Sequence, residues 1–293
     1  MPELPEVETI ALDLKKKVLQ RTFIDLWIQD PSIIHHPSNT RDFKKQILGK
    51  TILDVQRRAK NILFFLNKDC VLLIHLKMTG HLLVGKWEFK NNQWVPLQKG
   101  ALQDDPINKF LRIIFTLDNQ EQLALSDLRR FAKLELWKKD VLFSSKKFRT
   151  LGPEPLDPNF TFNKFCQLFQ KKRGCLKLVL MDQNFIAGIG NIYASEILFE
   201  ARLHPETRVE HLTLEDLKRL YGAIRNVLVK GIAARGASIS DYRDIQGNKG
   251  NYQKIIQVYG REGECCPVCG AKIKRITLGG RGTFYCPVCQ IKK

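Results

Sequence analysis

Two identical CPVC tetrapeptides near the end of the chain constrain its fold more than any other feature. They run from Cys266 to Cys269 and from Cys286 to Cys289, with sixteen residues between them. Each Cys-x-x-Cys knuckle turns two thiolates toward one point, so the pair predicts a closed, tetrahedral site for one structural Zn²⁺ ion. Cys265 is left over, because only Cys266 keeps the repeat. The alternative is a redox pair, which would usually accompany a βαβ pattern that the sequence lacks.

The residues between the two knuckles predict a small, basic β-hairpin. Residues 272–278 and 281–285 form the two strands, and Gly279 and Gly280 form the turn that places Arg281 at its tip. Such a hairpin suits a nucleic-acid groove. A zinc ribbon can equally bind protein, so the module alone predicts binding rather than chemistry.

Charge and length narrow the class of protein. The chain has 293 residues, which suggests about two domains, and a formal net charge of +18. This excess favours an anionic partner, with nucleic acid first and an acidic membrane second, although a merely basic surface remains open. The apolar runs are too short to cross a membrane, and the N-terminus lacks a signal-peptide pattern. We expect a soluble, cytoplasmic monomer with no membrane partner.

The hydrophobic pattern predicts an α+β protein with several domains. Val7, Ile10, Leu14 and Val18 recur at helical spacing and predict a first helix. Short apolar runs at 62–66, 71–76, 81–84, 111–117 and 122–125 then predict an antiparallel β-sandwich or barrel. Three prolines mark a linker at 151–158, and helices are expected at 161–172, 191–202 and 214–233, the last capped by Thr213 and Asp216. The expected domains are a sandwich (1–150), the linker, a helical domain with a loop (159–256) and a zinc finger (257–291).

A glycine hairpin precedes the second of these helices. Gly188 and Gly190 lead into Asn191, and a helix N-terminus of this kind offers backbone N–H groups to a phosphate. Asn191 can cap the helix, and a basic cluster lies upstream at 171–173. An ordinary turn between two helices is the alternative.

The amino terminus could supply a reactive amine. A small second residue normally permits removal of the initiator methionine, which would leave Pro2 as a free secondary amine. An α-amino group has a pKa of about 7.7–8.0, so a substantial part is neutral at pH 7 and can attack a sugar carbon. The helix end should lower this pKa and Glu3 and Glu6 should raise it, so the net sign stays open. Alternatively, Pro2 and Pro5 merely start a helix.

These segments together resemble a known family. PELPEVET at the start, GIGNIYASEILF in the middle and VYGREGE, CPVC and GGRGTFYCPVCQ at the end resemble the bacterial formamidopyrimidine-DNA glycosylases, in the same order from Pro2 to Gln290. Leu4 favours this branch over the related endonuclease VIII enzymes. The resemblance implies an N-terminal β-sandwich with an N-terminal helix, a helix–two-turn–helix domain and a C-terminal zinc finger.

The resemblance also assigns chemical roles. It implies that Pro2 is the Schiff-base nucleophile, that Glu3 protonates the opening deoxyribose ring, and that Lys60 aids β-elimination and contacts phosphate. Arg281 matches an arginine credited with δ-elimination, although a guanidinium is better suited to holding the departing phosphate. The alternative for Lys60 is one more exposed cation.

Further positions match residues that contact DNA. Lys172 and Asn191 match DNA contacts, and Lys177 matches a lysine near the damaged nucleotide. Met78, Arg129 and Phe131 match side chains that fill the hole left by an extruded base. Met78 and Phe131 could alternatively be core residues.

Two segments depart from the family pattern. Asn108 replaces a histidine that contacts DNA, so it can hydrogen-bond a phosphate but carries no charge. The loop at 236–251 has the family's usual location for covering the damaged base, but its flanks are altered. These departures make the preferred lesion less certain than the reaction type.

The sequence therefore predicts a bifunctional glycosylase and abasic-site lyase of base excision repair. Its partner would be double-stranded DNA containing oxidised purines or abasic sites, and binding would place it at the nucleoid. The alternatives are an endonuclease VIII-like enzyme for oxidised pyrimidines and a zinc-ribbon DNA-binding protein without catalysis.

Overall fold

The computed structural model describes residues 1–292 and divides them into two compact units. Unit 1 comprises Met1–Arg149 and Ala234–Gln253. Unit 2 comprises Thr150–Ala233 and the described residues from Lys254 onward.

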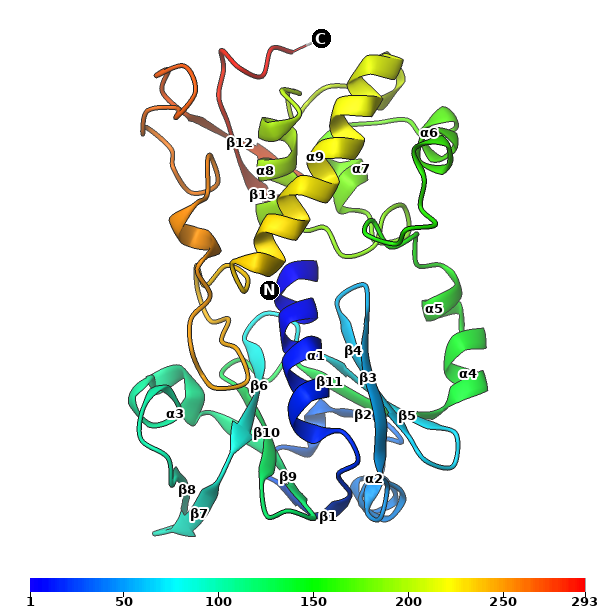
Figure 1. Ribbon diagram of the computed structural model, residues 1–293, viewed down its shortest axis with the longest axis vertical. Coiled ribbons are helices and arrows are strands. Elements are labelled where there is room, and N and C mark those ends of the chain that lie inside the picture. The colour runs from blue at the N-terminus through cyan, green and yellow to red at the C-terminus, as the bar shows by residue number, and fades with distance from the viewer. Residues whose placement is uncertain (293) are drawn as a thin grey trace. The chain divides into compact units, whose positions relative to one another are not determined.

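Unit 1 contains two β-sheets that face each other as a sandwich (Figure 1). The four-stranded sheet has the order β1-β9-β10-β6, and the five-stranded sheet has the order β2-β11-β5-β4-β3. The pairing is antiparallel except between β2 and β11, which run parallel and were not expected. The strands are β1 (Phe23–Ile28), β2 (Ile34–His36), β3 (Ile52–Arg58), β4 (Asn61–Leu66), β5 (Cys70–His75), β6 (Gly80–Gly85), β9 (Leu111–Leu117), β10 (Gln122–Asp127) and β11 (Lys133–Lys138).

Alternate side chains of these strands build the core between the sheets. Ile62 and Phe64 of β4 point into the same apolar cluster as Phe115 of β9 and Leu123 of β10. Burying one such side chain completely contributes about 1.5–3 kcal/mol. The alternation has a period of two residues, so it fixes which face of each strand is buried.

Helix α1 (Leu4–Val18) packs against this core through the apolar stripe that the sequence predicted. Val7, Ile10, Leu14 and Val18 are all fully buried. Pro5 lies in the first turn, where its missing N–H costs no hydrogen bond. The helix therefore fixes the start of the chain beside the sandwich (Figure 1).

The outer faces of both sheets are also covered, by elements that the sequence reasoning did not predict. The four-stranded sheet carries a second apolar cluster beneath β7 (Trp87–Lys90), β8 (Gln93–Pro96) and α3 (Ala101–Asp104). The five-stranded sheet carries another beneath α4 (Lys139–Ser144) and α5 (Lys146–Arg149). These pieces are too short to show a clear period. The remaining elements of unit 1 are α2 (Thr40–Ile47), η1 (Pro31–Ile33) and η2 (Pro106–Lys109).

Unit 2 is helical and carries the cysteine module. Its helices are α6 (Phe162–Gln170), α7 (Leu176–Met181), α8 (Asn191–Glu200) and α9 (Leu214–Ala233), with η3 (Val209–His211) before α9 and η4 (Tyr252–Lys254) at the boundary between the units. The predicted cap of α9 is confirmed, because Asp216 and Thr213 exchange hydrogen bonds at its start. Helix α8 is buried along most of its length and packs against α9 and against the hairpin of β12 (Lys274–Leu278) and β13 (Arg281–Tyr285).

One boundary differs from the expected domains. The segment Ala234–Gln253, which the sequence analysis placed in the helical domain, groups with unit 1. Its Tyr242 and Ile245 are part of the sandwich core, and the N–H of Val84 in β6 donates to the Ile245 carbonyl at 2.8 Å. A pattern without helical or strand periodicity could not show that this loop packs against a sheet edge.

Among the residues that the structure describes, no helix is long and apolar enough to cross a membrane.

Candidate functional site

The first residues of the chain are buried at the start of α1. Pro2 and Glu3 are buried, whereas Met1 is 43% exposed. Glu3 caps the helix and forms a capping box with Glu6, in which the Glu3 N–H donates to Oε2 of Glu6 at 2.8 Å. Oε1 of Glu6 accepts from the N–H of Ala237 at 2.7 Å. Glu6 therefore joins the chain start to the segment that follows α9.

The α-amino group lies in an environment that favours its neutral form. Desolvation is the largest influence and lowers the pKa of the Met1 amine below its ordinary value of 8.0. The carboxylates of Glu3 and Glu6 oppose this shift, while Lys60 acts with it, and the net direction is downward. The direction of this shift depends on burial, which only the fold gives, and the expectation for the Pro2 amine itself stays a prediction. Removal of Met1 would move the free amine to Pro2, which is buried.

Lys60 is held near the chain start by the turn between β3 and β4. The preceding residue, Ala59, has a left-handed backbone with φ of +55°. Arg57 donates from Nε to Glu8 of α1 at 2.5 Å and from Nη1 to the Ala59 carbonyl at 3.1 Å, which pins the turn against the helix. Lys60 itself is buried, so the alternative of an exposed cation is wrong.

Met78, Arg129 and Phe131 lie on two exposed loops of unit 1. Met78 is 42% exposed in the turn before β6, and Phe131 is 47% exposed in the loop between β10 and β11. The guanidinium carbon of Arg129 lies 4.6 Å from the centre of the Phe131 ring, a cation–π contact. Met78 and Phe131 are therefore not core residues.

A buried carboxylate at the end of β10 ties these two loops together. Asp127 accepts hydrogen bonds from the hydroxyl of Thr79 and from the N–H groups of Arg129 and Ala132, at 3.3 Å and 2.8 Å for the two N–H groups. The Arg129 N–H also donates to the Thr79 hydroxyl at 3.0 Å. Thr79 and Asp127 thereby fix the backbone beneath the three exposed side chains.

In unit 2, Lys177 and Asn191 connect the glycine hairpin to the cysteine module. Lys177 is fully buried in α7, and its Nζ donates to Oδ1 of Asn191 and to the hydroxyl of Thr283, each at 2.7 Å. The Asn191 amide donates to the Gly282 carbonyl at 3.0 Å. These bonds fix the strand that begins with Arg281, whose side chain is exposed.

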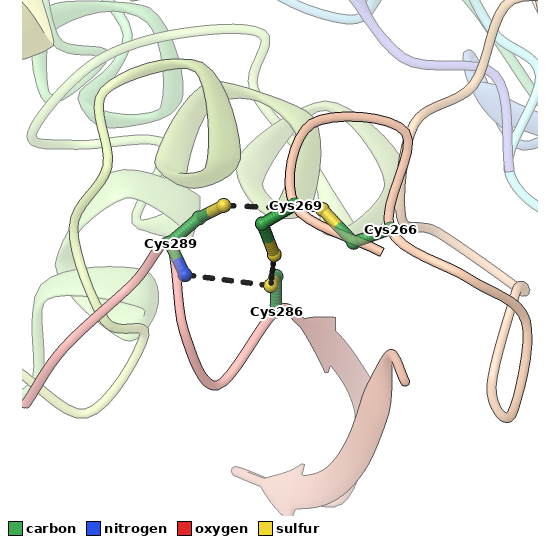
Figure 2. Close-up of side chains that lie close together, drawn as sticks. All are labelled: Cys266, Cys269, Cys286 and Cys289. Atoms are coloured by element: carbon green, nitrogen blue, oxygen red, sulfur yellow. Dashed lines mark hydrogen bonds between the residues drawn. The ribbon is translucent and has the colours of Figure 1, made fainter. Parts of the chain in front are cut away.

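The four predicted metal ligands come together in unit 2. Cys266, Cys269, Cys286 and Cys289 place their sulfur atoms within 4.8 Å of one another (Figure 2). The Cys269–Cys286 and Cys266–Cys289 pairs are 3.4 Å and 3.9 Å apart. Tetrahedral Zn²⁺ with Zn–S bonds of about 2.3 Å separates its sulfurs by about 3.8 Å, so the cluster fits one ion.

The surroundings of the four sulfurs support a structural ion. Desolvation and the neighbouring sulfurs raise the pKa of Cys289, so a cation is needed to stabilise the thiolate form. Cys265 is exposed and outside the cluster, as predicted. All four positions of the tetrahedron are protein ligands, so the ion would stabilise the fold of the module and activate no water.

Three family models match successive parts of the chain. They are the formamidopyrimidine-DNA glycosylase N-terminal domain at residues 1–134, the formamidopyrimidine-DNA glycosylase H2TH domain at 151–243, and the zinc finger found in FPG and IleRS at 263–291. A formamidopyrimidine-DNA glycosylase of Pelotomaculum thermopropionicum is 39% identical over 290 residues, which is 99% of each chain. The chain belongs to the formamidopyrimidine-DNA glycosylase family.

Solved structures of this family share the fold. A mutant Lactococcus lactis FPG in complex with DNA containing Fapy-dG is 33% identical, with a TM-score of 0.86 over 99% of this chain and 100% of that one. The wild-type enzyme of the same organism, in complex with DNA containing an oxidised pyrimidine, gives a TM-score of 0.85 at the same identity and coverage. The predicted fold, with its sandwich, helical domain and zinc finger, is confirmed.

Three of the expected DNA contacts have internal partners. Lys177 is buried and bonded within unit 2, and its contact near the damaged nucleotide stays a prediction. Lys172 pairs with Asp182 at 3.0 Å but stays partly exposed. Asn191 is the first residue of α8 and Gly190 is the N-cap, so the predicted capping by the Asn191 side chain is wrong. The side-chain amide of Asn191 donates to the Gly282 carbonyl instead, which explains why this side chain does not cap the helix.

Asn108 also has internal partners, and its phosphate contact stays a prediction. It is buried, its amide donates to the carbonyls of Ala101 and Gly247 at 2.7 Å and 3.3 Å, and its oxygen lies 3.0 Å from Nε2 of His81. Both amide hydrogens and the oxygen are therefore used inside unit 1.

The sequence reasoning missed a buried acid in α8 of unit 2. Glu196 of α8 accepts hydrogen bonds from the N–H groups of Gln257, Val258 and Tyr259 at 2.8–3.0 Å. Burial raises the pKa of this carboxyl group, and the three N–H groups partly oppose the shift. The signal was available, since an acid in an otherwise apolar helix needs buried partners.

Proposed function

We propose that the chain is a DNA glycosylase and abasic-site lyase for oxidised purines, with Pro2 as its nucleophile after removal of Met1. The observation that carries the proposal is the buried chain start, where desolvation and Lys60 lower the pKa of the α-amino group. A neutral amine has the lone pair that attack on C1′ of deoxyribose requires. Family membership supports the same reaction.

The reaction would proceed through a covalent intermediate. The Pro2 nitrogen would bond to C1′ as the C1′–N bond to the damaged base breaks and the base leaves with the bonding electrons and a proton. Opening of the sugar ring would then give an iminium ion, with Glu3 as the proton donor to the ring oxygen. Loss of a C2′ proton would break the C3′–O bond, which is β-elimination, and a second elimination would release the 5′ phosphate. Water would finally hydrolyse the iminium bond and regenerate the amine.

The remaining residues would stabilise charges and hold the DNA in position. The Lys60 ammonium is buried near the amine, so it would favour the neutral nucleophile and a nearby phosphate. Arg281 would hold the departing phosphate through its fork of N–H groups. Met78, Arg129 and Phe131 would fill the space left by the extruded nucleotide, which their exposure on two fixed loops supports.

Affinity would come mainly from the phosphate backbone of duplex DNA. A net charge of +18 supports this, and binding should weaken steeply as salt concentration rises. The same affinity for chromosomal DNA would place the protein at the nucleoid.

Borohydride trapping tests the proposal. The purified protein is incubated with duplex DNA containing 8-oxoguanine opposite cytosine and then reduced, which converts an iminium ion into a stable covalent adduct. We expect an adduct with the wild type and a much weaker one with Pro2→Gly, which replaces the secondary ring amine by a primary amine, while both proteins contain one zinc per chain. A tight complex without an adduct or strand cleavage would instead support a DNA-binding protein without catalysis.

A second substrate class has a specific observation in its favour. The Lactococcus lactis enzyme has been crystallised with DNA containing an oxidised pyrimidine. A parallel reaction on thymine glycol, under the same conditions, measures which class this chain prefers. Faster release of the pyrimidine would contradict the assignment to oxidised purines.

A further inference from the structure

The loop at 236–251 has an exposed tip between buried ends. Ile239 is 47% exposed and Ser240 is also exposed, whereas Ala237 on one side and Tyr242 and Arg243 on the other are buried. The loop contains no helix or strand, so its conformation depends on side-chain contacts.

Both ends of the tip lie near the start of the chain. The Ala237 N–H donates to Glu6, and a Cβ at Gly236 would come within 2.7 Å of the Glu6 side chain. On the other end of the tip, Asp241 raises the pKa of the α-amino group through its charge. A base that leaves the carbon attacked by this amine would therefore depart close to the tip.

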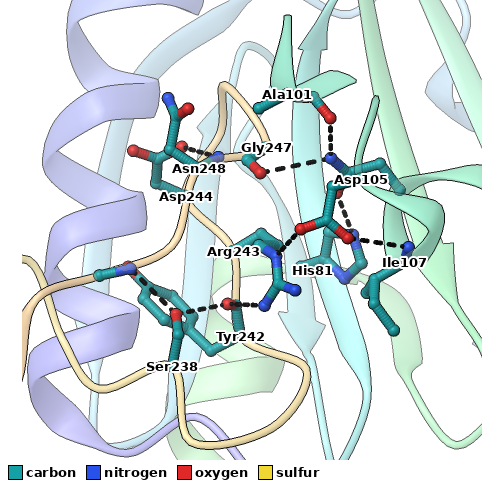
Figure 3. Close-up of polar contacts among 12 residues, drawn as sticks. His81, Ala101, Asp105, Ile107, Ser238, Tyr242, Arg243, Asp244, Gly247 and Asn248 are labelled. Carbon is teal, nitrogen blue, oxygen red and sulfur yellow. Dashed lines mark hydrogen bonds and ion pairs between the residues drawn. The ribbon is translucent and has the colours of Figure 1, made fainter. Parts of the chain in front are cut away.

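A buried ion pair anchors the far end of the tip. Nε of Arg243 lies 2.7 Å from Oδ2 of Asp105, and both side chains are largely shielded from solvent (Figure 3). Nη1 of Arg243 donates to the carbonyls of Ser240 and Tyr242 at 3.2 Å and 2.8 Å. One guanidinium thus links the segment before β9 to the backbone of the tip itself.

Asn108 makes a second link from the same segment. It donates to the Gly247 carbonyl, and its oxygen lies 3.0 Å from Nε2 of His81 in β6. Gly247 has φ of +81°, and a Cβ there would lie 2.4 Å from the Asn108 amide nitrogen. The contact therefore requires glycine at 247 for both backbone and space.

A third set of contacts closes the loop on itself. Oδ1 of Asp244 accepts from the N–H groups of Gln246 and Asn248 at 3.0 Å and 2.9 Å. The Ser238 hydroxyl donates to the Tyr242 carbonyl at 2.7 Å and accepts from the Gly250 N–H at 2.9 Å. These bonds give the loop one preferred shape once its ends are anchored.

We propose that the Asp105–Arg243 ion pair and the Asn108–Gly247 contact form an anchor that holds the tip at 238–241 beside the α-amino group before substrate binds. Asp105, Asn108 and Arg243 are positioning residues for release of the base. The inference rests on the proposed function of that amine. Asn108 and the loop at 236–251 are the two segments that depart from the family pattern, and the contact between Asn108 and Gly247 joins them.

The test separates release of a base from cleavage at a site that has none. Asp105→Asn leaves the buried Arg243 charge without its ionic partner. In single-turnover reactions we expect release of 8-oxoguanine from duplex DNA to slow by roughly tenfold or more, because misplacement of about 1 Å can have such an effect. Cleavage at a preformed abasic site should change less than about twofold, since there is no base for the tip to contact.

Controls distinguish positioning from general damage to the fold. The double variant Asp105→Arg/Arg243→Asp should recover part of the lost base release. Glu135→Gln removes another carboxylate paired with a cation in unit 1, to Lys147 at 2.9 Å, and should leave the ratio of the two rates unchanged. If Asp105→Asn does not fold, Asn108→Ala decides the question with the same two substrates.

Hydrogen exchange of the free protein provides an independent readout. Amides of 236–251 should be protected in the wild type and should exchange faster in Asp105→Asn, with unchanged exchange in the strands of unit 1. Equal loss of both activities, or unchanged base release with an unprotected loop, would overturn the anchor. A wild type that is inactive on both substrates would instead refute the proposed function.

Discussion

At the residue scale, the neutral state of the α-amino group depends on opposing influences within a few residues. Burial and the Lys60 ammonium lower its pKa, and the carboxylates of Glu3 and Glu6 raise it. Among the groups that shift this pKa, Glu6 also has defined structural contacts, namely its bonds to Glu3 and Ala237. The same side chains therefore set both the position and the charge of the amine.

The pH dependence of adduct formation tests this balance. Burial lowers the pKa of the Met1 amine below 8.0, and we expect the buried Pro2 amine to behave alike, so the acid limb of the rate should have its midpoint below 8.0. Lys60→Met removes a cation, which makes the protonated amine more favourable, so the midpoint should move to higher pH. The measurement is the single-turnover rate of borohydride-trappable adduct on an abasic site as a function of pH. A midpoint at or above 8.0 in the wild type, or a shift to lower pH in the variant, would contradict the account.

At the element scale, short loops are fixed by single buried polar groups. Asp127 holds the two loops that carry Met78, Arg129 and Phe131, and it accepts hydrogen bonds from one hydroxyl and two N–H groups. A carboxylate can accept all of these bonds, whereas an amide presents an N–H group to one of the donors.

Asp127→Asn should therefore loosen both loops. We expect the free energy of unfolding to fall by about 1–3 kcal/mol, because a buried donor loses its acceptor. Cleavage at an abasic site should slow more in double-stranded than in single-stranded DNA, since only a duplex leaves a stacked gap to fill. The matched control is Asp118→Asn, which affects an exposed pair with Arg21 at 3.8 Å. Equal slowing on both substrates would show that Asp127 stabilises the unit without positioning these side chains.

The sequence predicted the long elements and the cysteine cluster better than it predicted the polar contacts. Helix α9 and the cysteine cluster follow from periodicity and spacing, which are local properties of the chain. The internal roles of Lys177 and Asn108 could not be predicted, because their partners at Thr283 and Gly247 lie more than a hundred residues away. The residue type and the family match indicate which interactions a side chain can make. Only the fold shows which partner it actually contacts.

At the scale of the whole molecule, the residues with expected functions are distributed over two compact units. Unit 1 contains the amine, Lys60, the exposed loops and the anchored tip, and unit 2 contains the zinc module and Arg281. Segment Ala234–Gln253 returns to unit 1 after α9, so the chain passes between the units more than once. The division predicts that Pro2→Gly weakens covalent chemistry while the metal content of unit 2 remains intact.

Mass spectrometry of the borohydride-reduced adduct tests the central claim most directly. The account predicts that the purified protein begins at Pro2 and that the sugar remnant is attached to the peptide containing that residue. Attachment to a lysine side chain, or normal cleavage of damaged duplex by chains that retain Met1, would contradict it.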